Sequence, residues 1–286
     1  MAGKLYLCAT PIGNLGDITY RVVETLKNAD LIAAEDTRGS IRLLNHFDIH
    51  VPMTSYHEYN KYEKGRVLVQ KMLDGANIAL VTDAGTPGIS DPGEELVRMC
   101  VEAGIEVTSL PGPAACITAL TMSGLSTRRF CFEGFLPTDK KEREPVLARL
   151  AGETRTTVFY EAPHRLLKTL ELLQEAAGPE RQIAVCRELT KLHETVFRGS
   201  LFEAIAYYTQ NPPKGEIVLV LDGVSAEALA REKEETFAQL PLAVHMQRYL
   251  DQGQSKKEAM KSVAADRGVS KREIYQMLLE IENEET

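Results

Sequence analysis

The residues best suited to chemistry lie in the stretch IALVTDAGTPGISDPG, at positions 78–93. Positions 78–81 form a continuous apolar run, which predicts a strand buried on both faces. The loop after it holds three glycines, which let the backbone approach a ligand, and two aspartates that can accept hydrogen bonds. A helix pattern follows over 94–103, and this order of elements builds ligand sites in open α/β sheets. We expect Asp83 to contact a small molecule; the alternative is a turn aspartate bonded to its own backbone.

Other predicted strands also end in loops of small or polar residues. The segment TPIGNLGD at 10–17 follows the first strand, and it either walls a ligand pocket or makes a tight turn into a helix. The segment PGPAA at 111–115 offers backbone N–H groups and room for a ring system, and it equally suits a domain linker. The segment EDTR at 35–38 ends the second strand, where a capped helix start is the alternative interpretation.

Ionisable side chains gather near two later strands. The segment YEAPHR at 160–165 places Glu161, His164 and Arg165 at a strand end, with Pro163 in position to begin the next helix. The segment PPKGE at 212–216 precedes the last strand. It is either a simple turn or a place where Lys214 contacts an anion, a role that also suits Arg38 and Arg165.

Two common nucleotide-binding signatures are absent from the sequence. The loop at 10–17 has the spacing G-x-x-G, and no strand is followed by G-x-G-x-x-G or by a P-loop with Lys-Ser/Thr. This disfavours NAD(P)-dependent enzymes, nucleotide hydrolases and the commonest Rossmann-like methyltransferases.

Short apolar runs alternate with helix patterns almost to Gly223, which predicts an α/β fold with mostly parallel strand pairing. The expected strands are residues 4–9, 31–34, 78–82, 106–110, 130–135, 156–160, 182–187 and 216–221. The expected helices are residues 19–28, 41–47, 58–73, 94–103, 114–122, 140–150, 165–177 and 201–208. Because proline and glycine at 111–113 interrupt regular structure, we predict α/β domains over 1–112 and 113–223 and a helical tail over 224–286.

The tail is expected to end in two short helices, 256–266 and 271–282, joined by a Gly-Val-Ser turn like a helix-turn-helix. Six basic residues outnumber three acidic ones between positions 256 and 273. This local positive surface suits phosphate contacts, and a solvated pair of helices is the alternative.

Length, charge and cysteine content restrict the class of protein. A chain of 286 residues favours two compact units, and its net charge of −8 is the wrong sign for binding nucleic acid over the whole surface. The five cysteines are odd in number and lack C-x-x-C spacing, which favours a reducing cytosol over a disulfide framework or a zinc site. No apolar run suits a bilayer span or a signal peptide, so we expect a cytoplasmic protein with no membrane or metal partner.

Five segments, taken in order, resemble the ribosomal small-subunit methyltransferase I family of the tetrapyrrole-methylase superfamily, whose members are class III methyltransferases. They are ATPIGNLGD at 9–17, AEDTR at 34–38, VTDAGTPGISDPG at 81–93, LPGP at 110–113 and YEAPHR at 160–165. The resemblance covers nearly the whole chain, and the Asp83 loop together with YEAPHR is specific to this branch. It implies two αβα domains with S-adenosylmethionine in the cleft between them. It also implies that a homodimer methylates the ribose 2′-oxygen of a cytidine in the decoding region of 16S rRNA, within the assembled small subunit.

The resemblance further implies which residues line the cofactor. They are Pro11, Gly13, Asp83, Gly88, Ile89, Ser90, Pro111, Ala114, Ala115, Tyr160, Ala162, Leu189, Gly215 and Glu216. Many relatives carry Ser at the position of Ala114, so a backbone contact here must replace any bond from that hydroxyl.

Methyl transfer to a hydroxyl requires in-line geometry and help in removing the proton. Glu161 and His164 are our candidates for the base, with Arg38, Arg165 and Lys214 holding RNA phosphate. The tail candidates for RNA binding are Lys256, Lys257, Lys271 and Arg272. Two other functions stay open: methylation of a small tetrapyrrole-like metabolite, and non-enzymatic nucleic-acid binding through the tail. The second leaves the glycine-rich strand ends unexplained.

Overall fold

Two five-stranded sheets form the larger part of the structure, a computed structural model that describes residues 1–284. Both belong to one compact unit, Met1–Leu150 with Arg155–Asp222, and a second unit consists of Ala151–Thr154 with Gly223–Thr286. All strands of the first sheet precede Gly112 in the chain, and all strands of the second sheet follow it. The α/β class is confirmed, and the domain boundary after Gly112 stays a prediction.

The first sheet has the strand order β3-β2-β4-β1-β5. Its strands are β1 (Lys4–Cys8), β2 (Leu31–Ala34), β3 (Met53–Ser55), β4 (Ile78–Val81) and β5 (Glu106–Leu110). All neighbouring strands run parallel, so their carboxyl ends meet at one edge of the sheet.

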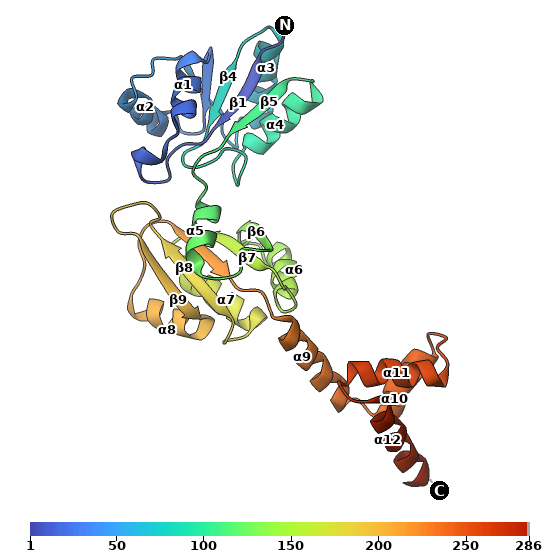
Figure 1. Cartoon of the computed structure of the whole chain (residues 1–286). Helices are drawn as coiled ribbons and strands as arrows, with labels where there is room; N and C mark the ends of the chain where they lie inside the picture. The colour runs from blue at the N-terminus through green and yellow to red at the C-terminus, as the bar shows by residue number, and fades with distance from the viewer. Residues whose placement is uncertain (285–286) are drawn as a thin grey trace. The chain divides into compact units, whose positions relative to one another are not determined.

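Helices cover both faces of this sheet. Helices α1 (Tyr20–Asn28) and α2 (Thr37–His46) pack on one face, and α3 (Lys61–Leu73) and α4 (Gly93–Glu102) pack on the other (Figure 1). Along β4, Ile78 and Leu80 join the core under α3 and α4, whereas Ala79 and Val81 join the core under α1 and α2. This burial on both sides explains why β4 is an unbroken apolar run in the sequence.

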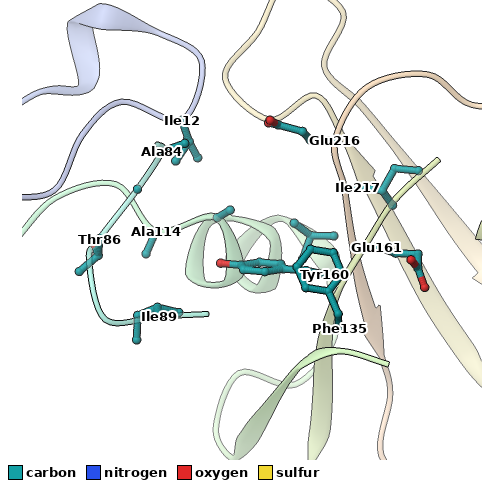
Figure 2. A pocket seen from close by; sticks show the side chains of 13 residues that line it. Ile12, Ala84, Thr86, Ile89, Ala114, Phe135, Tyr160, Glu161, Glu216 and Ile217 are labelled. Carbon is teal, nitrogen blue, oxygen red and sulfur yellow. The ribbon is translucent and has the colours of Figure 1, made fainter. Parts of the chain in front are cut away.

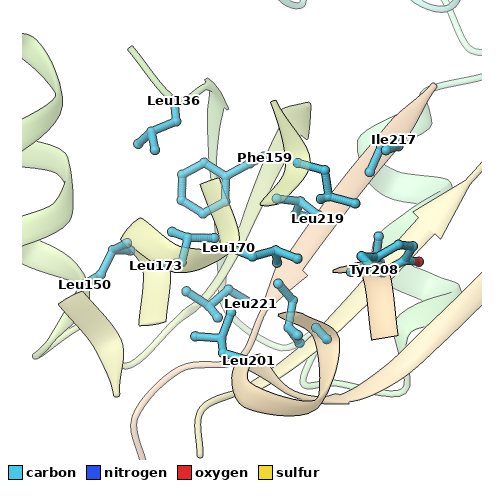
Figure 3. Close-up of a cluster of buried hydrophobic side chains, with 14 residues drawn as sticks. Leu136, Leu150, Phe159, Leu170, Leu173, Leu201, Tyr208, Ile217, Leu219 and Leu221 are labelled. Atoms are coloured by element: carbon cyan, nitrogen blue, oxygen red, sulfur yellow. The ribbon is translucent and has the colours of Figure 1, made fainter. Parts of the chain in front are cut away.

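The second sheet has the order β6-β7-β10-β8-β9. Its strands are β6 (Phe130–Phe135), β7 (Thr156–Glu161), β8 (Gln182–Arg187), β9 (Thr195–Ser200) and β10 (Ile217–Leu221). Helix α5 (Ala115–Ser123) packs on one face. Helices α6 (Lys140–Leu150), α7 (Leu166–Ala177) and α8 (Leu201–Gln210) pack on the other. Figure 3 shows the core beneath these three helices, where Phe159, Leu170 and Leu219 are fully buried.

Strand direction in the second sheet differs from the prediction of mostly parallel pairing. Only β6 and β7 pair in parallel, and the other three neighbouring pairs are antiparallel. A loop over 188–194 joins β8 to β9 as antiparallel neighbours, so no crossover helix separates them. The sequence analysis missed β9, which has little buried surface, and β3, a half-buried strand of three residues.

The second unit contains α9 (Ala226–Gln239), α10 (Leu242–Leu250), α11 (Lys256–Asp266) and α12 (Lys271–Glu284). Helix α10 was missed, whereas α11 and α12 begin where the sequence predicted them. The last three helices share a core around Met246, Val263 and Ile274. Within the described residues, none of the helices combines the length and apolar character needed to cross a membrane.

Candidate functional site

Backbone hydrogen bonds join the loops that follow β1 and β4. The N–H of Thr10 donates to the carbonyl oxygen of Gly85 at 2.9 Å, and the N–H of Gly85 donates to that of Thr10 at 3.0 Å. Gly85 has a φ of +87°, which disfavours any residue with a side chain. The hydroxyl of Thr86 donates to the carbonyl oxygen of Pro113 at 2.8 Å. The β4 loop is therefore bonded both to the β1 loop and to the segment that leads into α5.

The carboxylate of Asp91 organises the rest of the β4 loop. It accepts hydrogen bonds from the N–H groups of Gly88, Ile89 and Gly93, at distances from 2.7 to 3.2 Å. The backbone here turns through left-handed conformations, with φ of +88° at Gly88 and +63° at Ser90. These bonds hold Ile89 at the tip of a fixed loop.

A cavity of about 220 Å³ opens beside this loop. Figure 2 shows Ile12, Ala84, Thr86 and Ile89 on one side of it and Phe135, Tyr160 and Ile217 on the other. The rest of its wall consists of Gly85, Ala114, Ala115, Glu161, Glu216 and Val218. The lining combines apolar side chains with a few polar groups, as ligand sites do.

Tyr160 is the main aromatic group of the cavity. Its ring lies against Phe132 and Phe135, with centroid distances of 4.9 and 5.8 Å and edge-to-face geometry. Its hydroxyl points toward Ala114 in Figure 2. Burial raises the pKa of the Tyr160 phenol above its ordinary value, so the group stays protonated and can donate a hydrogen bond.

Three charged residues, Glu188, Lys191 and Glu216, are bonded to one another at the rim of the cavity. The carboxylate of Glu188 accepts hydrogen bonds from the N–H of Glu216 and from Nζ of Lys191, both at 2.9 Å. The N–H of Glu216, followed by Lys191, holds the pKa of Glu188 below its ordinary value. Nζ of Lys191 also bonds to the Glu216 carboxylate at 2.9 Å. Gly215 turns here with a φ of +85°, and a Cβ on it would lie 2.2 Å from Cδ of Glu188.

A second hollow, of about 370 Å³, lies beside the β1 loop. It is lined by Thr10, Pro11, Gly13, Leu15, Gly39, Arg42, Leu43, His46 and Asp83. Asp83 is exposed, and its Oδ1 accepts a hydrogen bond from the N–H of Asp36 at 3.0 Å. That bond joins the end of β4 to the start of α2, where Asp36 is the N-cap.

The cofactor residues predicted from the sequence divide between these two spaces. Ile89, Ala114, Ala115, Tyr160 and Glu216 line the cavity, whereas Pro11, Gly13 and Asp83 line the hollow. Gly88, Ser90, Pro111, Ala162, Leu189 and Gly215 line neither, although Gly88, Ser90 and Gly215 belong to the loops that shape the cavity. Their predicted roles stay predictions.

The sequence analysis missed several cavity residues. They are Ile12, Ala84, Gly85, Thr86, Phe135, Ile217 and Val218. The first four lie within loops that had already been singled out, and Phe135 ends a predicted strand, so position at a strand end was the available signal. Ile217 and Val218 begin β10, and their apolar character gave no sign of a site.

The two candidates for a general base differ in environment. Glu161 is buried, and its carboxylate accepts hydrogen bonds from the hydroxyl of Thr169 at 2.5 Å and the N–H of Ala162 at 2.8 Å. It also pairs with Nε of Arg165 at 3.3 Å. This carboxylate is occupied by neighbours of its own chain. His164 is exposed, and its role stays a prediction.

The residues predicted to contact RNA also differ in their exposure and in their bonds within the fold. Arg165 donates to the carbonyl oxygen of Leu136 as well as pairing with Glu161, so it is committed within the fold. Arg38 is 92% exposed in its side chain and makes one long ion pair with Asp36, at 3.4 Å. Lys214 is exposed, as are Lys256, Lys257 and Arg272 in the second unit, while Lys271 is half-buried. Among the described residues, no cluster of three or more His, Cys, Asp or Glu is arranged to hold a metal ion.

Comparison with known proteins gives a consistent result. The model of the family described as Tetrapyrrole (Corrin/Porphyrin) Methylases matches residues 4–205. Three relatives carry the name Ribosomal RNA small subunit methyltransferase I. That of Synechocystis sp. is 51% identical over 98% of this chain and 99% of that protein. The Bacillus subtilis protein is 45% identical over 96% and 93%, and the Escherichia coli O157:H7 protein is 44% identical over 97% and 95%.

Solved structures show the same fold at low identity. Diphthine synthase superposes with a TM-score of 0.61 at 12% identity, over 77% of this chain and 90% of that chain. The methyltransferase CobJ gives 0.60 at 19% identity, over 78% and 95%. At these identities the likeness concerns the fold alone.

Proposed function

This chain belongs to the ribosomal RNA small subunit methyltransferase I family, and we propose that it methylates the ribose 2′-oxygen of a cytidine in the decoding region of 16S rRNA. The methyl donor in this proposal is S-adenosylmethionine, which carries its methyl group on a sulfonium. The observation that supports it most is the cavity at the strand ends, walled by loops from both sheets.

The residues of the cavity suit the chemistry of this cofactor. Tyr160 and Phe135 supply aromatic faces for a flat ring, and Ile12 and Ile89 supply apolar contacts. Helix α5 begins beside the cavity, and its N-cap Ala114 makes no side-chain hydrogen bond to the first turn. The small side chains of Ala114 and Ala115 leave the backbone N–H groups in the first turn of α5 accessible to a ligand. Gly85 extends the space, because a Cβ there would lie 3.4 Å from Cγ2 of Ile12.

In this proposal the chain's residues bind and orient the two reactants. The loop held by Asp91 and the rim held by Glu188 keep the cofactor walls in place before binding, so little ordering is required when the ligand arrives. The buried carboxylate of Glu161 fixes the start of α7 through Thr169 and Arg165, which favours a positioning role over that of a base.

The rRNA part of the proposal rests on family membership and on local basic residues. The net charge of −8 means that RNA contact must be confined to patches, such as Arg38 on α2 and the exposed lysines of α11. We propose that the α11–α12 pair adds phosphate contacts. Deleting residues 224–286 then weakens RNA binding and lowers its salt dependence, with cofactor affinity unchanged.

A direct assay separates this function from the alternatives. The protein is incubated with labelled S-adenosylmethionine and with 30S subunits, free 16S rRNA or a tetrapyrrole precursor. We expect label in the 16S rRNA of the 30S sample. Label in the tetrapyrrole alone, or in no fraction, would contradict the proposal.

Quaternary state and location are part of the same proposal. We propose a homodimer in the cytoplasm, where small subunits are assembled. Light scattering coupled to size-exclusion chromatography tests the first statement, with twice the 31.7 kDa chain mass as the expected result.

A further inference from the structure

The hollow beside the β1 loop adjoins the cofactor cavity through two pairs of neighbouring residues. In the β1 loop, Pro11 lines the hollow and Ile12 lines the cavity. In the β4 loop, Asp83 lines the hollow and Ala84 lines the cavity. Figure 2 shows Ile12 and Ala84 on the same side of the cavity. The two spaces are therefore adjacent at these loops, and methyl transfer requires that an acceptor oxygen in the hollow reach within about 3–3.5 Å of a methyl group in the cavity.

One face of α2 supplies the outer wall of the hollow. Gly39, Arg42, Leu43 and His46 follow the spacing i, i+3, i+4, i+7, so they share a side of the helix. Arg42 and His46 are exposed there, and Arg38 continues the same row one turn earlier. The structure gives Arg42 no ion pair or side-chain hydrogen bond with any described residue. Its guanidinium is free to bind an anion, for which its planar fork suits phosphate.

The loop after β4 offers an acceptor for a hydroxyl. Asp83 keeps its orientation because the N–H of Asp36 donates to its Oδ1 at 3.0 Å, yet the residue is exposed to the hollow. An ionised carboxylate accepts hydrogen bonds only, which matches a ribose hydroxyl. Pro11, Leu15 and Leu43 add apolar surface to the lining of the hollow. The guanidinium of Arg42, the carboxylate of Asp83 and the apolar side chains of the lining together suit the phosphate, the ribose and the base of a ribonucleotide.

We propose that this hollow binds the acceptor ribonucleotide, with Asp83 accepting the hydrogen bond of the ribose 2′-hydroxyl and Arg42 contacting a neighbouring phosphate. The inference rests on the proposed function, since it assumes that RNA is the methyl acceptor. It assigns Asp83 to the acceptor ribose instead of the cofactor role expected from the sequence. Here Asp83 orients the attacking oxygen, and Arg42 sets the register of the RNA strand.

Binding experiments test Arg42 without relying on methyl transfer. We compare Arg42→Ala with Arg66→Ala, because Arg66 is an exposed arginine on α3, which covers the other face of the first sheet. The probe is a single-stranded oligonucleotide of the 16S decoding region, titrated at several salt concentrations. Arg42→Ala loses a charge-assisted phosphate contact, so its affinity for the oligonucleotide should fall about 10-fold or more. The slope of the logarithm of its binding constant against the logarithm of the salt concentration should fall by about 0.7. Arg66→Ala should match the unaltered chain.

Kinetics on 30S subunits test Asp83. Asparagine keeps an oxygen that can accept from Asp36, so Asp83→Asn preserves the loop while removing the charge. We expect kcat to fall by about 10- to 100-fold, with the calorimetric Kd for S-adenosylmethionine unchanged. Arg42→Ala should instead act mainly on KM for the subunit.

The outcomes distinguish the inference from the proposed function. If the unaltered chain transfers no methyl group to RNA, the proposed function fails, and the oligonucleotide titration still decides whether Arg42 binds RNA. If Arg42→Ala binds the oligonucleotide as Arg66→Ala does, the hollow is not the acceptor site. If Asp83→Asn weakens S-adenosylmethionine binding in step with its loss of activity, Asp83 belongs to the cofactor and the inference is overturned.

Discussion

Glu161 and Arg165 form an ion pair at the end of β7, with 3.3 Å between Oε1 and Nε, and the side chain of Glu161 is fully buried. Both residues had been expected to act on the RNA substrate. Their pairing, with the bonds from Thr169 and Ala162 to the same carboxylate, makes them part of the support for α7. The segment YEAPHR thus lines the cavity through Tyr160 and Glu161, and Glu161 and Arg165 also bond within the fold, while their roles toward RNA stay predictions.

Replacing Glu161 should cost folding stability. Glu161→Ala removes the buried acceptor of the Thr169 hydroxyl and the partner of the half-buried Arg165, and the loss of such an acceptor costs about 1–3 kcal/mol. Urea denaturation followed by circular dichroism measures the free energy of unfolding. His164→Ala is the matched control, since His164 is exposed and its loss should change that free energy by less than about 0.5 kcal/mol. Equal stability of the two variants would contradict the structural role.

Gly215 should be intolerant of a side chain because of its neighbour as well as its backbone. Gly215→Ala places a Cβ 2.2 Å from Cδ of Glu188, which must move and release Lys191 and Glu216. We expect a loss of about 2–4 kcal/mol in stability, from backbone strain and overpacking together, and weaker cofactor binding.

Gly253→Ala is the control for Gly215→Ala. Gly253 has a φ of +84°, close to the +85° of Gly215, and nothing lies within 4 Å of an added Cβ. It should therefore show the strain of about 1–2 kcal/mol alone, with cofactor affinity unchanged in calorimetry. Equal effects of the two variants on cofactor affinity would mean that the Glu188 rim is unimportant.

Asp91 should matter for loop order more than for direct contact. Asp91→Ala removes the acceptor for the N–H groups of Gly88, Ile89 and Gly93, at a cost of about 1–3 kcal/mol. Hydrogen exchange read by mass spectrometry should show faster exchange over residues 82–93, with β4 still protected. Unchanged exchange in this loop would show that its conformation does not depend on Asp91.

The second unit should lose stability in mild acid. His245 is buried, its Nδ1 accepts from Nε of Arg267 at 3.2 Å, and its Nε2 faces Asp266 at 3.2 Å. Burial, followed by the charges of Arg267 and Arg248, lowers the pKa of His245 below 6.5, although Asp266 opposes this. The folded state therefore favours neutral histidine. The contribution of His245 to the stability of the second unit is complete above the pKa that this histidine has in the unfolded chain. It is lost as pH falls from there through the lower pKa that His245 has in the folded chain.

Hydrogen exchange of α10 and α11 tests this pH dependence. After correction for intrinsic rates, protection should fall between about pH 7 and about pH 5.5. His245→Gln removes the titrating group, so its protection should change little over that interval. A steeper loss in His245→Gln than in the unaltered chain would contradict the assignment to His245.

Burial pattern explains how much of the fold was predictable. Strands buried on both faces, such as β4 and β10, are unbroken apolar runs, and the sequence identified both. Strand β9 lies at an edge of its sheet and mixes exposed and half-buried residues without regular alternation, so its pattern resembled a loop. The direction of β10 was not predictable, because its pairing with β7 and β8 depends on which strands it meets in space.

Position along a loop explains how much of the site was predictable. Ile89, Tyr160 and Glu216 belong to segments at strand ends that the sequence singled out, and the family resemblance named them as cofactor residues. Sequence alone did not separate Asp83 from Ala84, although in the structure Asp83 lines the hollow and Ala84 lines the cavity. Nor did it reveal Arg42, because a single arginine within a helix resembles any solvated surface residue until the facing loop is known.

The most direct test of the proposed function is the identity of the methylated nucleoside. Unmethylated 30S subunits are incubated with the protein and S-adenosylmethionine, and the decoding-region fragment of 16S rRNA is digested for mass spectrometry. We predict 2′-O-methylcytidine from this fragment, strongly reduced with Asp83→Asn and unchanged with Arg66→Ala. A methyl group on a base, or on no nucleotide of this fragment, would contradict the proposed function.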